Sequence, residues 1–413
     1  MKTINPTTEE VIQEYNEMKE EEVYQVIREM GQAQNEWQNR SYAERADQLR
    51  VIARVLKQRK AALAEQMTRE MGKPVKQAKS EIEKCAWVSE YYADHGEEFL
   101  ADIQVDSSAS NSYVTYNPLG LVLAIMPWNF PYWQLFRFGI PALMAGNGVL
   151  LKHAPNVTGC ALEIEKIMHE AGIPEKLFRT LVIDVELTQK VIEQPEVRAV
   201  SLTGSTRAGK AVASKAGSHL KKTVLELGGS DPYLILEDAD LDQAIEACAT
   251  SRLINSGQSC IAAKRFIVVE SQYEAFVEGM QRKLESYKVG DPTAEDTDVG
   301  SQAREDLRDE LHRQVQESVD RGANCLMGGY IPDRKGFFYP VTLLTDVNQG
   351  MPAYEEELFG PVATVIKAKN EQEAIRIAND SDYGLGAAVF TEDEERGERI
   401  ASGKTGSRLL LCK

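Results

Sequence analysis

The residues most capable of chemistry are a cysteine and a glutamate in neighbouring parts of the chain. Cys260 follows a Gly-Gln-Ser turn in INSGQSCIAAKRFIVVE, and Glu226 lies in VLELGGSDP. A thiolate can attack a carbonyl carbon, and a carboxylate can act as a general base on a thiol or a water. The apolar run Phe266–Glu270 predicts a buried strand just after the cysteine, with Cys260 and Glu226 on neighbouring loops. A lone cysteine is more often a small buried residue, so the pair alone leaves both interpretations open.

Three further positions could complete such a site. Asn129 lies in the loop PWNFP, and its side-chain amide could donate to a developing oxyanion. Lys152, at the end of a short apolar run, and Gly204 with Ser205 could hold the ribose and phosphate of a nucleotide. Taken singly, a buried asparagine more often satisfies its own loop and a strand-end lysine is more often solvated. Together the set describes oxidation of an aldehyde by a nicotinamide cofactor through a thioester.

The turn LTGSTRAG at 202–209 is a candidate anion site. Gly204 and Gly209 permit a close backbone approach, and the turn opens a predicted helix whose N-terminus would favour a negative charge. It is not the GxGxxG fingerprint of dinucleotide-binding folds. As a bare pattern it more often marks an ordinary turn from strand to helix.

The elements that must position these residues follow an α/β order. Apolar runs at 119–125, 149–152, 177–182 and 199–202 alternate with helix-periodic segments, which predicts a doubly wound parallel sheet. Ligands of such sheets bind beyond the carboxyl ends of the strands, where Asn129, Lys152 and Gly204 fall. We therefore expect a cofactor-binding domain from 1–101 and 119–228, interrupted by a β-hairpin at 102–118.

The remainder predicts a second α/β domain at 229–405, with a C-terminal tail at 406–413. Strands are expected at Tyr233–Leu236, Phe266–Val269, Val362–Ile366 and Ala387–Phe390, with helices between them. The acidic stretch EEELFGP at 355–361 ends in Phe-Gly-Pro and by itself reads as a solvated turn. The fold class we expect is thus α/β, with two α/β domains and a protruding hairpin.

Composition excludes several classes of protein. The 413-residue chain has a formal net charge of −17, which argues against nucleic acid or an anionic membrane as a partner. The six cysteines form no CxxC pair and the five histidines no HExxH pair, so no zinc site or disulfide framework is expected. No secretory signal and no apolar run of about 20 residues is visible. We expect a cytoplasmic protein without a resident metal.

Six motifs in a fixed order resemble the aldehyde dehydrogenase superfamily over almost the whole chain, from INPTTEEVI to about Gly406. They are PWNFP at 127–131, LLKHAP at 150–155, LTGSTRAG at 202–209, LELGGSDP at 225–232, GQSC at 257–260 and EEELFGP at 355–361. The resemblance implies that Cys260 is the nucleophile, Glu226 the general base, and Asn129 with the backbone amide of Cys260 the oxyanion hole. The thiolate would add to the aldehyde, hydride would leave to the nicotinamide, and Glu226 would activate water to hydrolyse the thioester.

The same resemblance assigns the cofactor, NAD or NADP. It implies that Lys152 binds the adenosine ribose, Ser205 a phosphate oxygen and Glu357 the nicotinamide ribose. It places Phe359 beside the nicotinamide ring, and Trp128, Gly204, Gly209 and Leu227 around the cofactor. Many NAD-preferring relatives carry a glutamate three residues after the ribose lysine, where this chain has Pro155. A carboxylate at this place would repel the 2′-phosphate of NADP. Because Pro155 carries none, we predict that both cofactors work.

The substrate is expected to carry its own charge. Arg137, in FPYWQLFRFGIPAL, resembles the arginine that succinate-semialdehyde dehydrogenases use for the substrate carboxylate. An ordinary helix-surface arginine is the competing interpretation. Arg265 could be a second anchor, although an arginine at that place is general in the superfamily. We expect a short ω-carboxylated aldehyde such as succinate semialdehyde.

The C-terminus departs from the family pattern. Relatives continue after Gly403 with some forty or more residues that close part of the substrate tunnel and join the hairpin across a subunit interface, whereas this chain ends at Lys413. We expect a homodimer or homotetramer if that strand is not essential. The alternative is a truncated, catalytically weak chain. A third possibility, a relative that acylates coenzyme A, is disfavoured by Glu226 because that route needs no activated water.

Overall fold

The computed structural model describes residues 1–402 and 410–412. The chain folds into two compact units. The first unit comprises Met1–Ile4, Val11–Glu70 and Lys76–Glu226, and the second comprises Asn5–Glu10, Met71–Val75 and Leu227–Lys413. Each unit contains its own sheet, and each is described separately below.

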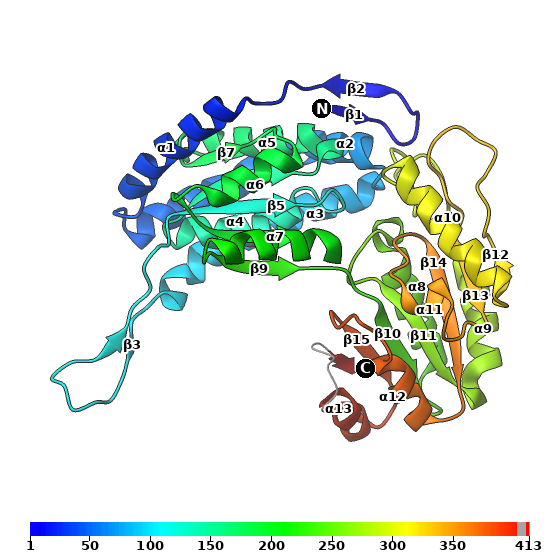
Figure 1. Cartoon of the computed structure of the whole chain (residues 1–413). Coiled ribbons are helices and arrows are strands. Elements are labelled where there is room, and N and C mark those ends of the chain that lie inside the picture. Colours follow the sequence, from blue (N-terminus) through cyan, green and yellow to red (C-terminus); the bar gives the residue numbers. More distant parts are fainter. Residues whose placement is uncertain (403–409, 413) are drawn as a thin grey trace. The chain divides into compact units, whose positions relative to one another are not determined.

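The first unit is built on a five-stranded sheet in the order β7-β6-β5-β8-β9 (Figure 1). The strands are β5 (Leu121–Met126), β6 (Gly148–His153), β7 (Phe178–Thr180), β8 (Val197–Thr203) and β9 (Lys222–Glu226). Every neighbouring pair is parallel. β5, the first strand of this sheet along the chain, lies in the middle; β6 and β7 follow on one side of it, and β8 and β9 on the other. This change of side is the mark of a doubly wound sheet, so the predicted fold is confirmed.

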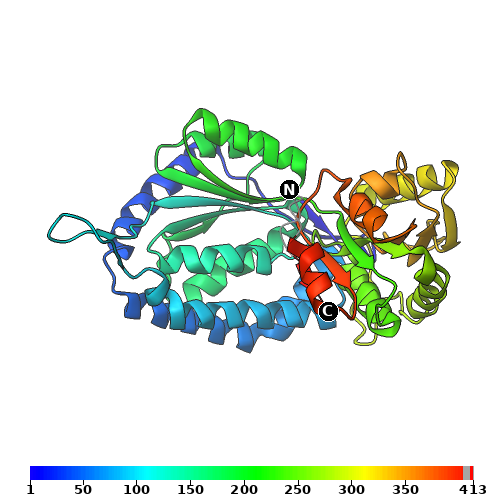
Figure 2. The same cartoon turned by 90° about the horizontal axis from the view of Figure 1, so that it is seen from below.

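Helices cover both faces of this sheet (Figure 2). They are α1 (Glu20–Trp37), α2 (Tyr42–Met71), α3 (Val75–Phe99), α4 (Trp133–Met144), α5 (Thr158–Glu170), α6 (Val185–Glu193) and α7 (Thr206–Ser218), with the short 3-10 turn η1 (Pro155–Val157) before α5. The central strands read as continuous apolar runs because they are buried on both faces; β6 is buried throughout. The helices bury apolar stripes, as α1 does with Val23, Ile27 and Met30.

One strand of this sheet was not predicted from the sequence. Glu226 was expected on a loop, but it is the last residue of β9, which pairs with β8 at the edge of the sheet. The edge position explains the error, because β9 has a neighbour on one side only and its side chains are at most half-buried. Val224 is 59% exposed, so the strand lacks the apolar run that marked the central strands.

Two small hairpins complete the first unit. Strands β1 (Lys2–Ile4) and β2 (Val11–Glu14) pair near the N-terminus. Strands β3 (Ile103–Gln104) and β4 (Tyr113–Val114) pair antiparallel, with Ile103 opposite Val114, as expected for residues 102–118. Figure 1 shows this second hairpin extending from the end of the unit's helices.

The second unit holds a seven-stranded sheet in the order β12-β13-β14-β11-β10-β15-β16. The strands are β10 (Asp231–Ile235), β11 (Ala263–Val269), β12 (Asn324–Met327), β13 (Thr342–Thr345), β14 (Val362–Ala368), β15 (Ala387–Phe390) and β16 (Leu410–Cys412), all parallel to their neighbours except β12. The helices are α8 (Leu241–Leu253), α9 (Glu270–Glu285), α10 (Glu305–Asp320), α11 (Pro352–Glu355), α12 (Glu371–Asn379) and α13 (Glu394–Ser402), with the 3-10 segment η2 (Ile254–Gly257) after α8. Two apolar clusters fill this unit, with alternate residues of β11, such as Phe266 and Ile267, in different clusters.

Two short stretches early in the chain pack with the second unit. Phe337 donates its backbone N–H to the carbonyl of Pro6 at 2.8 Å, and Val75 donates to Pro292 at 2.8 Å. Of the C-terminal tail that the sequence set apart, residues 406–409 and 413 lie outside the described residues. Leu410–Cys412 form β16, which pairs parallel with β15.

Candidate active site

The predicted site residues of the first unit follow the carboxyl ends of its parallel strands. Asn129 lies three residues after β5, Lys152 is next to last in β6, Ser205 follows β8 and Glu226 ends β9. Because the strands are parallel, all of these ends lie along one edge of the sheet, which is where ligands bind in doubly wound folds. The sheet topology therefore places these four residues along one edge.

The loop that carries Asn129 is held at its far end by two buried side chains. Glu81 accepts the backbone N–H groups of Tyr132 and Trp133, both at 3.0 Å, and so caps the start of α4. His153 accepts from the backbone N–H of Ala154 at 2.9 Å, which fixes its tautomer, so its Nε2 donates to the carbonyl oxygen of Pro131 at 2.9 Å.

These two residues were missed from the sequence. Burial lowers the pKa of His153 to about 4, so the ring is neutral and can keep this tautomer at neutral pH. The only signal for His153 was its place in LLKHAP beside Lys152, and Glu81 lies in an ordinary helix-periodic segment. The neighbouring Trp128 is half-buried, and Asn129 is buried.

Lys152 is a buried cation at the edge of the sheet. Only 8% of its side chain is exposed, and burial lowers its pKa, which the carboxylate of Asp184 partly offsets. Within residues 1–402 and 410–412 its amine forms no hydrogen bond or ion pair. A buried amine without an acceptor is suited to receiving the oxygen atoms of a ligand.

The turn after β8 joins two of the strand ends. Gly204 donates its backbone N–H to the carbonyl oxygen of Glu226 at 2.9 Å. This bond ties the turn after β8 to the last residue of β9. Ser205 is exposed and caps α7, with its hydroxyl accepting from the N–H of Ala208 at 3.3 Å. Gly209 is buried inside α7. This exposed helix start is a suitable place for a phosphate.

Arg137, on α4, is bonded to a strand end at the same edge of the five-stranded sheet. Its Nε donates to the side-chain oxygen of Gln134 at 2.7 Å, and one terminal nitrogen donates to the hydroxyl of Thr203, the last residue of β8, at 2.9 Å. Both acceptors are neutral. In the part of the chain that the structure describes, no carboxylate pairs with the guanidinium. The positive charge is thus held in place without being neutralised.

In the second unit, Cys260 follows a strained turn. Asn255 and Ser256 have φ angles of 55° and 56°, and Gly257 has 75°. Non-glycine residues rarely adopt this left-handed conformation, and surrounding contacts must hold them there. The hydroxyl of Ser256 accepts from the N–H of Gly300 at 2.9 Å, and the side-chain oxygen of Gln258 accepts from Ala303 at 2.9 Å. Both holding side chains are fully buried.

The thiol itself stands at an accessible place. Ala262 donates to the carbonyl of Ser259 at 3.2 Å, which closes a tight turn around Cys260 just before β11. Cys260 is half-buried, whereas Cys85, Cys160 and Cys248 are buried. Burial raises the pKa of Cys160 and Cys248 well above the usual range, which keeps those thiols protonated and inert. Cys260 therefore combines access with a fixed backbone.

Glu357 and the turn of LELGGSDP meet the cysteine turn around a buried lysine. Glu357 accepts the backbone N–H of Gly229 at 3.0 Å, and its Oε1 lies 3.7 Å from Nζ of Lys264. Lys264 in turn donates to the carbonyl oxygen of Cys260 at 2.9 Å. Leu227, two residues before Gly229, and Phe359, two residues after Glu357, are half-buried in the flanking loops. The sequence offered only the position of Lys264, four residues after the cysteine, and its role was missed.

Arg265 has a structural role that the sequence did not reveal. Its guanidinium donates to three backbone carbonyls, those of Ser230, Ile377 and Ala378, at 2.9–3.1 Å, and its side chain is 1% exposed. These bonds tie β11 to the start of β10 and the end of α12. The contacts of this buried arginine are thus to the backbone of its own unit.

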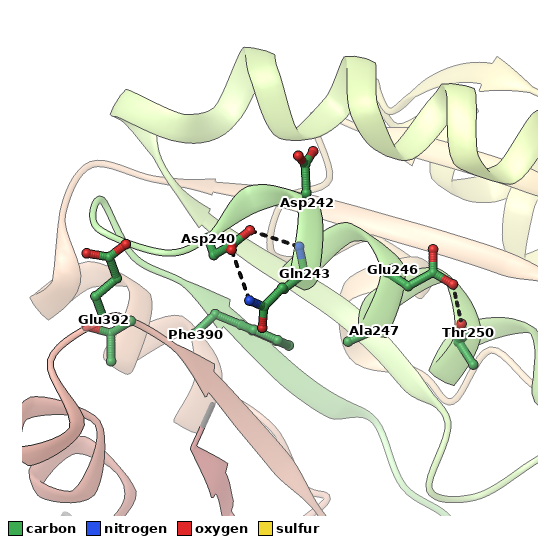
Figure 3. Close-up of a pocket in the computed structure, with 9 residues that line it drawn as sticks. Asp240, Asp242, Gln243, Glu246, Ala247, Thr250, Phe390 and Glu392 are labelled. Atoms are coloured by element: carbon green, nitrogen blue, oxygen red, sulfur yellow. Dashed lines mark hydrogen bonds between the residues drawn. The ribbon is translucent and has the colours of Figure 1, made fainter.

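A separate hollow lies on the surface of the second unit, beside α8 (Figure 3). It has a volume of about 850 Å³ and is lined by acidic residues, among them Asp240, Asp242, Glu246 and Glu392. Asp240 is occupied in capping α8 through the N–H of Gln243. Across the described ranges no three His, Cys, Asp or Glu side chains are grouped as metal ligands. This acidic hollow repels anionic ligands, and no cysteine is among its lining residues.

The fold and these sites define a class of enzyme. The chain belongs to the aldehyde dehydrogenase family, because the sequence profile of that family matches residues 1–406. It is accordingly an NAD(P)-dependent oxidoreductase that acts on aldehydes. No helix among the described residues has both the length and the apolar character needed to cross a membrane.

Individual relatives are close over most of the chain. A protein of Synechocystis named "Probable succinate-semialdehyde dehydrogenase" with NADP(+) is 46% identical over 401 residues, which covers 97% of this chain and 88% of the relative. A succinate semialdehyde dehydrogenase of Escherichia coli, named for NAD(P)+, is 44% identical and covers 89% of this chain and 79% of the relative. The solved structure of a Streptococcus pyogenes succinic semialdehyde dehydrogenase in complex with NADP+ has a TM-score of 0.97 at 35% identity, covering 100% of this chain and 90% of that one.

Proposed function

We propose that this enzyme oxidises succinate semialdehyde, or a close ω-carboxylated aldehyde, to the corresponding acid. The observation that carries the proposal is Arg137, whose guanidinium is held by Gln134 and Thr203 with no carboxylate partner in the described chain. A planar guanidinium forms strong charge-assisted hydrogen bonds with a carboxylate. Two relatives at 44–46% identity bear the same substrate in their names.

The chemistry assigned to the chain's own residues is covalent. The thiolate of Cys260 attacks the aldehyde carbon and forms a C–S bond, while the carbonyl π electrons move to oxygen. Asn129 and the backbone N–H of Cys260 donate to that oxyanion. After oxidation, Glu226 takes a proton from water, and the resulting hydroxide attacks the thioester and releases Cys260. The motif order in the sequence and family membership support these roles.

The described residues fit a phosphate-bearing nucleotide. Lys152 is a buried amine with no acceptor among the residues that the structure describes, and Ser205 stands at the exposed N-terminus of α7. Glu357 is half-buried and would accept hydrogen bonds from ribose hydroxyls. The cofactor, when bound, supplies the hydride acceptor. Pro155 is exposed and offers no carboxylate that would repel a 2′-phosphate, so we propose that NADP is used and that NAD is accepted as well.

A substrate panel tests the proposal. Formation of NADPH and NADH at 340 nm is followed with succinate semialdehyde, glutarate semialdehyde and uncharged butanal. We expect the charged aldehydes to have kcat/KM values at least tenfold above butanal. A preference above about a hundredfold, roughly 2.7 kcal/mol, for either cofactor would contradict the dual use of cofactors. Equal values for charged and uncharged aldehydes would contradict the substrate.

The same assay separates the alternatives. A folded but catalytically weak chain predicts little or no aldehyde-dependent absorbance change with either cofactor. A coenzyme A-acylating enzyme predicts that turnover requires coenzyme A. Titration of coenzyme A into the reaction distinguishes these outcomes, because the hydrolytic route through Glu226 proceeds without it.

We further propose that the chain assembles into a homodimer or homotetramer in the cytoplasm. The hairpin supports assembly, since Ile103, Tyr113 and Val114 are each about half exposed. Light scattering on the purified chain at micromolar concentration tests this. A monomeric mass would contradict it, and fractionation of the source cells tests the location.

A further inference from the structure

The side chain of Lys264 is embedded under the nucleophile's turn. Its Nζ donates to the carbonyl oxygen of Cys260 at 2.9 Å, to that of Ser259 at 3.0 Å and to that of Ala262 at 3.1 Å. An ammonium group has three N–H donors, so all of them are used on one four-residue turn. The side chain is 1% exposed.

Most of the charged groups around this amine favour its protonated form. Oε1 of Glu357 is 3.7 Å away, and the carboxylate of Asp231 also favours the charged form, as does Cys260. Burial and the guanidinium of Arg252 act against it. Burial, the largest influence, lowers the pKa of Lys264 to about 8, so the amine is mostly protonated at pH 7. Only the protonated amine can make all three donations.

One of the three contacts bears directly on catalysis. The carbonyl oxygen of Ser259 and the N–H of Cys260 belong to the same peptide group, and the described chain contains no cis peptide bond. In a trans peptide these two bonds point in opposite directions. When Lys264 holds the oxygen of Ser259, it therefore also fixes the direction in which Cys260 presents its N–H.

We propose that Lys264 is a positioning residue of the oxyanion hole, which orients and polarises the Ser259–Cys260 peptide so that its N–H can stabilise the oxyanion. This inference takes Cys260 as nucleophile from the proposed function. A cation at the carbonyl oxygen draws electron density from the amide and makes its N–H a stronger donor. Preorganised donors of this kind act without reorganisation during the reaction.

The experiment compares two reactions of the same thiol. Acylation by p-nitrophenyl acetate passes through a tetrahedral oxyanion, whereas alkylation by iodoacetamide displaces iodide and forms none. Both are followed as the part of the rate that depends on Cys260, and neither needs a cofactor or an aldehyde. A Cys260→Ser variant supplies the background, which includes reaction at the exposed Cys325. The rates are measured on the full chain and on Lys264→Met, which keeps the length of the side chain without its donors. Lys367→Met, at an exposed lysine on β14 of the same sheet, is the matched control.

We expect Lys264→Met to lower the ratio of acylation rate to alkylation rate about a hundredfold, as the loss of one oxyanion donor does. Lys367→Met should leave the ratio within about threefold. A parallel fall of both rates, or no change in the ratio, would overturn the proposal, because Lys264 would then act on the fold or on the thiol alone. Lys264→Gln, which keeps one donating group, should fall between the wild type and Lys264→Met.

Folding and function are read separately. Circular dichroism and thermal melting establish that each variant is folded, and failure of both Lys264 variants to fold would make the residue structural and overturn the proposal. Aldehyde oxidation is measured on the same preparations. If the wild type oxidises no aldehyde but the ratio still falls in Lys264→Met, the proposed function fails while the role of Lys264 stands.

Discussion

Gly257 packs directly against the carbonyl group of Gly360, so that a Cβ atom on Gly257 would overlap both the carbon and the oxygen of that group. Gly257 also has a φ of 75°, which disfavours any other residue. The contact joins GQSC to EEELFGP, two motifs nearly a hundred residues apart in the chain. The turn before Cys260 therefore depends on a loop that the sequence alone described as a solvated acidic turn.

This contact predicts that Gly257→Ala is damaging. The variant would combine a left-handed alanine with a clash against backbone, and we expect a loss of at least about 2 kcal/mol in the free energy of unfolding. Gly217→Ala is the control, because Gly217 lies in α7 with open space around its α-carbon. Alanine there should stabilise the chain by roughly 0.5–1 kcal/mol. Urea unfolding measures both, and equal effects would contradict the argument.

Arg137→Ala is predicted to raise KM selectively. Removing a charge-assisted hydrogen bond costs about 1.5–3 kcal/mol, or roughly 10- to 150-fold in KM for succinate semialdehyde, with kcat little changed. Butanal has no carboxylate, so its KM should stay within about twofold. An equal rise for the two aldehydes would show that Arg137 acts through its bonds to Gln134 and Thr203 rather than on the substrate.

The buried neutral ring of His153 leads us to predict that the free energy of unfolding falls in acid. Its pKa is lowered from the ordinary value of 6.5 to about 4 in the folded chain, so between these pH values the unfolded chain binds a proton that the folded chain does not. The free energy of unfolding therefore falls as the pH drops from 6.5 toward 4, by at most about 3 kcal/mol from this residue. His153→Gln keeps a donor toward Pro131 and should flatten this dependence. Identical pH profiles for the two proteins would refute the assignment.

For Glu70 we predict the opposite dependence of the free energy of unfolding on pH. This carboxylate is buried under the start of α5, where it accepts the backbone N–H of Gly159 at 3.1 Å and of Cys160 at 2.9 Å. Burial raises its pKa to about 7, so the folded chain holds a proton between pH 4.5 and 7 that the unfolded chain has lost. Its contribution is therefore greatest below pH 4.5 and is lost as the pH rises through 7.

The neutral variant Glu70→Gln tests this. The amide oxygen can still accept from the helix, and no buried charge arises at high pH. We expect the variant to gain stability over the wild type at pH 8, by at most about 3 kcal/mol, and to match it at pH 4.5. Thermal melting at the two pH values measures the difference, and a variant less stable than the wild type at pH 8 would contradict the prediction.

Local sequence patterns predicted most of the central elements because burial leaves a strong signal. β5 is a continuous apolar run, β6 begins with one, and α1 has an apolar stripe at helical spacing. The edge strand β9 left no such signal, since its exposed residues do not repeat a buried pattern. Arg265 left a different ambiguity, because a buried arginine that binds backbone carbonyls and an arginine that binds a ligand look alike in a sequence.

The sequence by itself determined the family, the order of the motifs and the residue types that could attack a carbonyl, because these depend on chemical identity and spacing along the chain. The tertiary structure decided what supports them. Lys264 under the turn of Cys260, Gly360 against Gly257, and His153 against Pro131 are contacts between separate segments. Their roles arise from proximity and burial in the folded chain, which no local pattern records.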